Sequence, residues 1–123
     1  MIKIFSPGIK KIKHLSSFLN EEMSRYCSPN VEAVIGWGHK PTAHHARVFA
    51  KEKKLPYIAL EDGFLRSLNL GVNGSSPIGL TVDTVGAYYD ATGPSQIELW
   101  LNSADEWMTP KLFKRAHEAI RLL

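Results

Sequence analysis

Short apolar runs alternate with segments of helical periodicity along this chain, and that alternation constrains its fold more than any other feature. The runs Ile2–Phe5, Val31–Ile35 and Tyr57–Leu60 have the length and composition of buried strands. Between them, residues 9–19 and 43–53 carry apolar side chains every three or four positions, which is typical of helices. The order strand–helix–strand–helix–strand predicts an α/β domain with a mainly parallel sheet flanked by helices.

The composition is that of one ordinary globular domain, residues 1–123. Hydrophobic residues make up 44% of the chain, and no apolar run approaches the roughly 20 residues of a membrane span. The short opening run, broken by Pro7 and Gly8, is not a signal peptide. The lone Cys27 excludes an internal disulfide and suits a reducing cytosol, and with no histidine partner suggested it is not expected to be a nucleophile.

Positive charge is concentrated in the first part of the chain. Residues 1–54 hold ten Lys and Arg against four Asp and Glu, whereas residues 55–123 hold five against eight. One interpretation is that the basic part favours binding to an anionic lipid surface or a phosphorylated acceptor. The other is that it is a solvated face with no partner. It matches no nucleic-acid-binding motif, so nucleic acid is not expected as a partner.

Two adjacent carboxylates, Glu61 and Asp62, follow the Tyr57–Leu60 run. Gly63 permits a sharp turn there. Arg66 follows with a positive charge, and its planar guanidinium group suits a carboxylate or phosphate. Ligands of α/β sheets bind at the carboxyl ends of strands, so we expect both carboxylates at one edge, within reach of the preceding loop, residues 39–42. A solvated charged turn explains the same residues without a ligand.

The loop that precedes the second helix contains His39, Lys40 and Thr42. Thr42 is a good N-cap, and a strand, a loop and a helix N-terminus form a ready anion site. The loop matches neither the Rossmann fingerprint nor the P-loop, and an ordinary strand-to-helix connection is an equal interpretation. His44 and His45 point about 100° apart on a helix and cannot chelate one metal, so no metal site is expected.

The second half begins with a glycine- and serine-rich stretch, residues 69–77, followed by predicted strands at Ile78–Val82 and Ala87–Tyr89. Ser95 opens a capping box, and Thr109 caps a last helix whose apolar stripe is expected to face the core. The chain then stops with no helix terminator, which is typical of a cut inside a longer protein. An uncovered apolar face there is expected to favour self-association.

Three stretches, Trp37–Ala43, Leu60–Ser67 and Val82–Thr92, occur in the order found in the KpsC/LipA family of capsule polysaccharide biosynthesis proteins, which this chain resembles throughout its length. Members of that family are retaining β-Kdo glycosyltransferases that use CMP-Kdo, where Kdo is an eight-carbon sugar acid. The resemblance implies the N-terminal, acceptor-side half of a two-lobed glycosyltransferase. The nucleotide-binding half has no counterpart in these residues.

The resemblance also implies roles for residues of this chain. Asp62 is implied to be the nucleophile that traps an oxocarbenium-like centre, with Glu61 as acid, base or orienting partner; the residues alone leave the opposite assignment open. Arg66 is expected to offset the Kdo carboxylate, unless it pairs with Glu61 or Asp83. The full set of substrate-binding candidates is Arg66, His39, Lys40, Thr42, Gly63, Ser67, Asp83 and Tyr89.

The implied reaction moves Kdo from CMP-Kdo to a lipid-linked glycan acceptor, with no cofactor besides the donor substrate. It implies a cytoplasmic protein in peripheral contact with the inner face of the inner membrane, inactive without its second lobe. Two rival interpretations stay open. One is a non-catalytic module or remnant that binds an acidic glycan or phospholipid head group, and the other is an unrelated nucleotide-binding α/β domain, which the missing phosphate-binding fingerprint disfavours.

Overall fold

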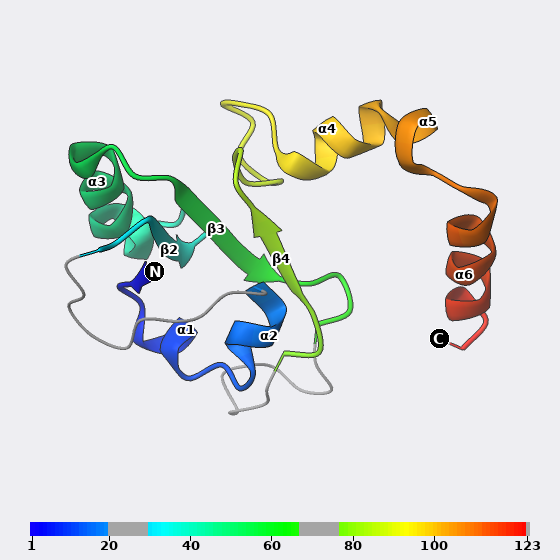
Figure 1. Cartoon of the computed structure of the whole chain (residues 1–123), viewed down its shortest axis with the longest axis horizontal. Helices are drawn as coiled ribbons and strands as arrows, with labels where there is room; N and C mark the ends of the chain where they lie inside the picture. Colours follow the sequence, from blue (N-terminus) through cyan, green and yellow to red (C-terminus); the bar gives the residue numbers. More distant parts are fainter. Residues whose placement is uncertain (20–29, 67–76, 123) are drawn as a thin grey trace.

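A four-stranded sheet forms the centre of the computed structural model, which describes residues 1–19, 30–66 and 77–122. The strands, in sheet order, are β1 (Ile2–Ile4), β2 (Ala33–Trp37), β3 (Tyr57–Asp62) and β4 (Leu80–Asp83). The first three are parallel, and β4 runs antiparallel to β3 (Figure 1). The predicted α/β class with a mainly parallel sheet is confirmed.

The first helical segment is two short helices rather than the single helix expected over residues 9–19. They are α1 (Pro7–Lys10) and α2 (Leu15–Leu19). His14, between them, has a φ of 58°, a left-handed conformation that no right-handed helix contains. The apolar spacing was correctly recognised, because both Ile9 and Leu15 are buried, but spacing alone did not reveal the interruption.

The second helix begins later than expected. A short 3-10 turn, η1 (Pro41–Ala43), precedes α3 (His44–Lys53). Thr42 therefore lies inside that turn, and Ala43 occupies the N-cap position without a side-chain hydrogen bond. The predicted N-cap role of Thr42 is wrong, because Pro41 already starts helical geometry one residue earlier.

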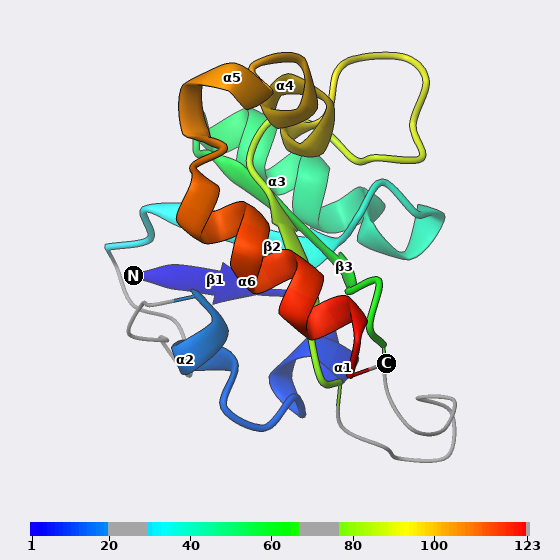
Figure 2. The same cartoon turned by 90° about the vertical axis from the view of Figure 1, so that its right-hand side faces the viewer.

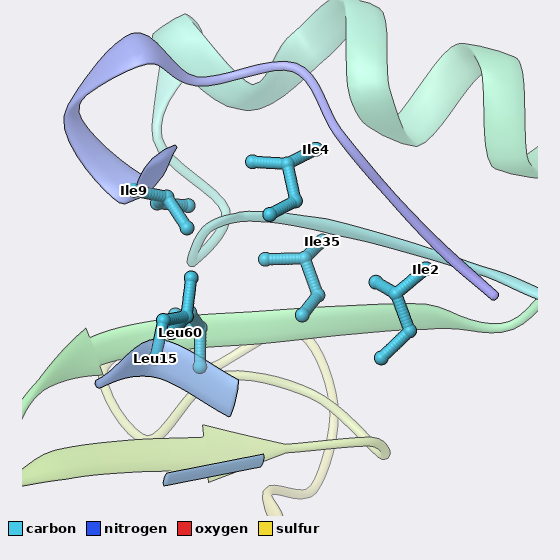
Figure 3. Close-up of a cluster of buried hydrophobic side chains, with 6 residues drawn as sticks. All are labelled: Ile2, Ile4, Ile9, Leu15, Ile35 and Leu60. Atoms are coloured by element: carbon cyan, nitrogen blue, oxygen red, sulfur yellow. The ribbon is translucent and has the colours of Figure 1, made fainter. Parts of the chain in front are cut away.

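Both faces of the sheet are covered. On one face, α1 and α2 enclose a cluster of Ile2, Ile4, Ile9, Leu15, Ile35 and Leu60 (Figure 3). On the other face, α3 packs Ala46 and Ala50 against Val34. Val34 and Ile35 are adjacent in β2 and both fully buried, because successive strand residues point to opposite faces. Each such side chain contributes about 1.5–3 kcal/mol on burial.

The second half matches its local signals in part. β4 forms near the predicted strand Ile78–Val82, but residues 87–89 form a turn and not the second expected strand. The capping box is present at the start of α4 (Gln96–Asn102), and Thr109 caps α6 (Pro110–Ile120) with a hydrogen bond from the Leu112 N–H. The short α5 (Ala104–Trp107) lies between them.

The last helix stands away from the sheet. Figures 1 and 2 together show α4, α5 and α6 as an arm beside the sheet, with α6 at its far end. No residue of α6 is buried, and Phe113 and Ile120 are 55% and 67% exposed. The expected core-facing stripe is therefore wrong for the described residues: an amphipathic pattern specifies a face that needs covering, not the element that covers it.

In the described part of the chain, no helix is both long and apolar enough to cross a membrane.

Candidate functional site

The carboxyl ends of β2 and β3 meet at one edge of the sheet. The Gly38 N–H donates to the Leu60 carbonyl at 2.9 Å, which continues the pairing of the two strands beyond Trp37. This bond places the loop after β2 directly against Glu61 in β3. The expected proximity of Glu61 to the loop of residues 39–42 is observed.

Glu61 is the centre of a polar cluster at this edge. The residue is 6% exposed; one carboxylate oxygen accepts from the Lys40 ammonium at 2.8 Å and the other from the Tyr89 hydroxyl at 3.1 Å. The hydrogen bond to Glu61 raises the pKa of Lys40. A buried carboxylate needs such partners, since an uncompensated one costs several kcal/mol. Three separate chain segments are thereby joined through one side chain.

Gly38 makes this cluster possible. Its φ is 43°, and a Cβ at this position would collide with the Tyr89 hydroxyl and the Glu61 carboxylate. The Tyr57 hydroxyl donates to the Gly38 carbonyl at 2.6 Å, and burial raises the pKa of Tyr57 to about 12, so it stays a neutral donor. A glycine is required because both backbone angle and space exclude a side chain.

His39 is held from two sides. Its Nδ1 lies 2.5 Å from an Asp90 carboxylate oxygen, and its backbone N–H donates to the Tyr89 hydroxyl at 2.7 Å. The other Asp90 oxygen accepts from the Thr92 N–H and hydroxyl. The hydrogen bonds from Thr92 and His39 hold the pKa of Asp90 well below its usual range. An ionised Asp90 on Nδ1 directs Nε2, on the far side of the ring, toward other partners.

Asp62 lies at the same end of β3 but on the opposite face. Because β3 extends through Asp62, the side chains of Glu61 and Asp62 alternate across the sheet. Asp62 pairs with Arg66 at 2.8 Å, and these side chains are 38% and 49% exposed. The alternative left open from sequence, that Arg66 pairs with Glu61 or Asp83, is wrong, because its observed partner is Asp62. The two carboxylates do not meet, although the charges of both raise the pKa of Lys40.

Asp83 has a structural role. It is 3% exposed; one oxygen accepts from the N–H groups of Val85 and Gly86 at 2.8 and 2.7 Å, and the other from that of Gln96 at 2.9 Å. These bonds fix the turn after β4 and tie it to the start of α4. Its predicted contact with substrate stays a prediction; the contacts observed connect β4 to α4.

The other predicted residues are more peripheral. The backbone of Gly63 approaches that of Gly79, to which its N–H donates at 2.9 Å, so this glycine allows a close chain crossing. Thr42 is exposed within η1. Ser67, like Cys27, lies outside the described residues. Within the ranges described, no group of three or more His, Cys, Asp or Glu could hold a metal ion.

Sequence reasoning missed Asp90 and Tyr57 as members of the site. Asp90 stands next to Tyr89 and two residues before Thr92, a pattern that also suits an ordinary turn, which the Thr92 contacts indeed form. Tyr57 opens a strand, where an aromatic residue is unremarkable. The partner of Asp90 lies 51 residues away in sequence and that of Tyr57 lies 19 residues away, so no local signal could have identified them.

A mainly parallel sheet with polar side chains gathered at the carboxyl ends of neighbouring strands defines an α/β protein of the class whose ligands bind at that edge. Residues 32–121 match the capsule polysaccharide biosynthesis protein family, and the chain belongs to that family. The resemblance to KpsC/LipA proteins drawn from its three motifs is confirmed.

Relatives of known name support this assignment. The chain is 49% identical over 115 residues to the capsule polysaccharide modification protein LipA of Neisseria meningitidis serogroup A, covering 94% of this chain and 16% of that protein. It is 31% identical over 98 residues to the lipopolysaccharide-processing protein LpsZ of Rhizobium meliloti, covering 80% of this chain and 22% of that protein. The chain thus spans about a sixth of LipA, at 16% of its length.

Two solved structures share the fold. The KpsC β Kdo 2,4 transferase of Thermosulfurimonas dismutans superposes with a TM-score of 0.84 at 46% identity, covering 98% of this chain and 38% of that one. The KpsC β Kdo 2,7 transferase of the same organism gives a TM-score of 0.61 at 24% identity, covering 98% and 41%, and shows the fold alone. The family match and the shared fold therefore agree with each other.

Proposed function

We propose that this chain is part of a glycosyltransferase that moves Kdo from CMP-Kdo to a lipid-linked acceptor with retention of anomeric configuration. The similarity to a KpsC β Kdo transferase at 46% identity supports the substrate. The observation that carries the proposal is the Glu61 cluster, in which Lys40 and Tyr89 converge on one buried carboxylate at the carboxyl edge of the sheet. Ligands of α/β proteins bind at this edge.

Glu61 acts in this proposal as a positioning residue. Both of its oxygens already accept hydrogen bonds, from Lys40 and Tyr89, and it is almost fully buried. Of the acid, base and orienting roles open to it from sequence, orientation fits best. The Lys40 side chain, half exposed, presents its ammonium to a ligand at the edge while Glu61 holds it in place.

Asp62 is the nucleophile in this proposal. Its side chain is 38% exposed and pairs with Arg66 at 2.8 Å. A carboxylate oxygen of Asp62 bonds to the anomeric carbon as CMP leaves with the bonding electrons. The acceptor hydroxyl then displaces Asp62, and its proton passes to solvent or a base. Two inversions give net retention.

The test uses the complete polypeptide that carries this sequence. Asp62→Asn is expected to abolish nearly all Kdo transfer without changing the melting temperature, and mass spectrometry of the wild-type enzyme with CMP-Kdo is expected to find an adduct on tryptic peptide 55–66. Asp105→Asn, on the surface of α5, is the matched control. An adduct on any other peptide, or substantial activity of Asp62→Asn, would show that Asp62 is not the nucleophile.

We also propose that these 123 residues alone do not transfer sugar. They correspond to 38% of the similar KpsC chain, and their loops match no phosphate-binding fingerprint. In the complete protein we place the reaction on the cytoplasmic side, at the inner face of the inner membrane, where a lipid-linked acceptor meets a nucleotide sugar. Calorimetry of the isolated chain with CMP-Kdo is expected to show no binding; measurable binding or turnover would contradict this proposal.

The second candidate function is a binding module for an acidic glycan or phospholipid head group. The basic side chains on α3 favour it. A complete polypeptide that binds such ligands but shows no Kdo transfer would support this alternative over the enzyme.

A further inference from the structure

A second surface lies along β1, the edge strand of the sheet, and the outer side of α3. Figure 1 shows α3 and the N-terminus of the chain on the same side of the molecule. In the sheet, β2 separates this surface from β3, the strand that carries Glu61. We call it the aromatic–basic surface and define it by Lys3, Phe5, Val48, Phe49 and Lys53.

Two phenylalanine rings form the centre of this surface. Phe5, directly after β1, and Phe49, on α3, have ring centroids 5.3 Å apart. The Lys3 ammonium lies over both rings, 4.0 Å from the centroid of Phe49 and 5.1 Å from that of Phe5. Phe5 is 37% exposed and Val48, next to Phe49, is 38% exposed. A positive charge is thereby held on apolar surface that remains open to solvent.

The chain on both sides of this edge strand is strongly basic. Residues 1–19 hold four lysines and no Asp or Glu, and residues 44–54 hold four Lys and Arg against one Glu. All of these cations except Lys3 are exposed. Lys53 follows Phe49 by four residues and so lies on the same side of α3. Because α1 contacts β1 on one face of the sheet and α3 covers the other, positive charge flanks the edge on both sides.

An anionic lipid surface suits both properties at once. Lysines close to such a membrane are attracted to its acidic head groups. Exposed aromatic and aliphatic side chains beside them enter the boundary between head groups and acyl chains. A small soluble anion would use the charges alone and would leave Phe5 and Val48 in water.

The position of this surface relates it to the Glu61 cluster. Since β1, β2 and β3 are parallel, Phe5 follows β1 at the same end of the sheet at which that cluster follows β2 and β3. A membrane in contact with Phe5 would therefore lie beside the carboxyl edge, where a lipid-linked acceptor has to arrive.

We propose that the aromatic–basic surface is where this protein contacts an anionic membrane. Lys3 and Lys53 face lipid phosphates, and Phe5 and Val48 enter the interface. The inference rests on the proposed function for the purpose of this contact, which is to meet a lipid-linked acceptor. It extends that function by assigning the membrane contact to one defined face of the chain.

The test measures co-sedimentation of the complete polypeptide with lipid vesicles. Vesicles of phosphatidylcholine with about 30% phosphatidylglycerol are compared with phosphatidylcholine alone, and the wild-type protein is expected to bind the anionic vesicles more tightly. Lys3→Gln with Lys53→Gln is expected to weaken that binding about 25-fold, because each lysine near an anionic membrane contributes about fivefold. Lys111→Gln with Lys114→Gln removes the same charge from exposed positions on α6 and is the matched control, expected to change nothing.

Phe5→Ser tests the apolar part of the surface. It is expected to weaken binding to the anionic vesicles about fivefold, because the exposed part of the ring no longer leaves water. Phe113→Ser, at a 55% exposed position on α6, is the matched control and is expected to bind like the wild-type protein. The melting temperature of each variant separates lost binding from lost folding, and the lysine variant decides the matter if Phe5→Ser does not fold.

Several results would overturn the inference. Wild-type protein that fails to bind anionic vesicles, or binds neutral ones equally, would exclude recognition of acidic lipid. Unchanged binding of the folded lysine variant would exclude this surface, and loss of binding in the α6 controls would place the contact on α6.

Failure of the proposed function is read separately, from Kdo transfer. Vesicle binding that depends on Lys3 and Lys53, in a protein that transfers no Kdo, would support the aromatic–basic surface while refuting the transferase. Transfer to the lipid-linked acceptor that is unchanged in a lysine variant with unchanged vesicle binding would leave the transferase intact and refute this surface.

Discussion

At the scale of single residues, Gly38 lies so close to the Glu61 cluster that no side chain fits at position 38. Its backbone is left-handed, and the position a Cβ would occupy is taken by Tyr89 and Glu61. Gly38→Ala is therefore expected to lower the free energy of unfolding by about 1–3 kcal/mol, from backbone strain alone. Displacement of Glu61 adds to this loss.

Urea unfolding of Gly38→Ala measures the effect. Gly93→Ala is the matched control, because nothing lies within 4 Å of a Cβ at Gly93 and its φ is not left-handed. Equal stability of the two variants would show that the cluster can rearrange to admit a side chain.

The raised pKa of Tyr57 predicts that the free energy of unfolding decreases at alkaline pH. Burial raises its pKa from 10 to about 12, so its ionisation is harder in the folded state than in the unfolded chain. The stability that this difference contributes is fully present below pH 10 and is lost as the pH rises toward 12. Tyr57→Phe has no such dependence, although it loses the hydrogen bond to Gly38, worth about 0.5–1.5 kcal/mol.

The measurement is the free energy of unfolding of both proteins at several pH values between 9 and 12, the range around the two pKa values. The wild-type protein is expected to lose its greater free energy of unfolding relative to Tyr57→Phe as the pH rises. Taking the difference between the two proteins cancels the titration of the lysines, which both contain. A difference that stays constant would contradict a raised pKa for Tyr57.

At the scale of elements, Asp83 connects β4 to α4 through three backbone N–H groups. Asp83→Asn replaces one accepting oxygen by an amide that faces an N–H donor. We expect a loss of about 1–3 kcal/mol in the free energy of unfolding, the usual effect of leaving a buried group unsatisfied. Transfer activity, measured where the variant is folded, is expected to stay near that of the wild-type enzyme.

Thermal melting and a transfer assay of the complete polypeptide check this. Asp105→Asn, in the exposed first turn of α5, is expected to change neither quantity. A variant of Asp83 with unchanged stability but lost transfer would instead support the substrate-binding role that the sequence suggested.

At the scale of the whole molecule, the arm formed by α4, α5 and α6 exposes large apolar side chains. On α6, Leu112, Phe113 and Ile120 are all at least 40% exposed. Exposed large apolar side chains promote association when they lie together on one face of a helix. The isolated chain is expected to self-associate with rising concentration, and Phe113→Ser with Ile120→Ser to reduce this.

Sedimentation analysis over a range of concentrations measures the association. Arg115→Ser, on the same helix and exposed, is the control that leaves the apolar face in place. Association that is unaffected by the double substitution would mean that α6 is not the surface involved.

Local patterns in the sequence were sufficient for the fold class and the family. Strand and helix periodicity predicted the alternation around β1, β2 and β3, and the caps at Ser95 and Thr109 form as expected. These signals are local because hydrogen bonds within a turn or helix involve residues three or four apart. The three motifs identified the family for a related reason: each is a contiguous stretch that can be matched without knowing its contacts.

Only the tertiary structure decided how the site is arranged. Pairing with β4 extends β3 through Asp62, opposite Leu80, and this extension puts Glu61 and Asp62 on different faces. The same long-range contacts let Asp83 connect β4 to α4 and brought Asp90 to His39. A side chain's neighbours across a sheet depend on register between distant segments, which periodicity in either segment alone does not determine.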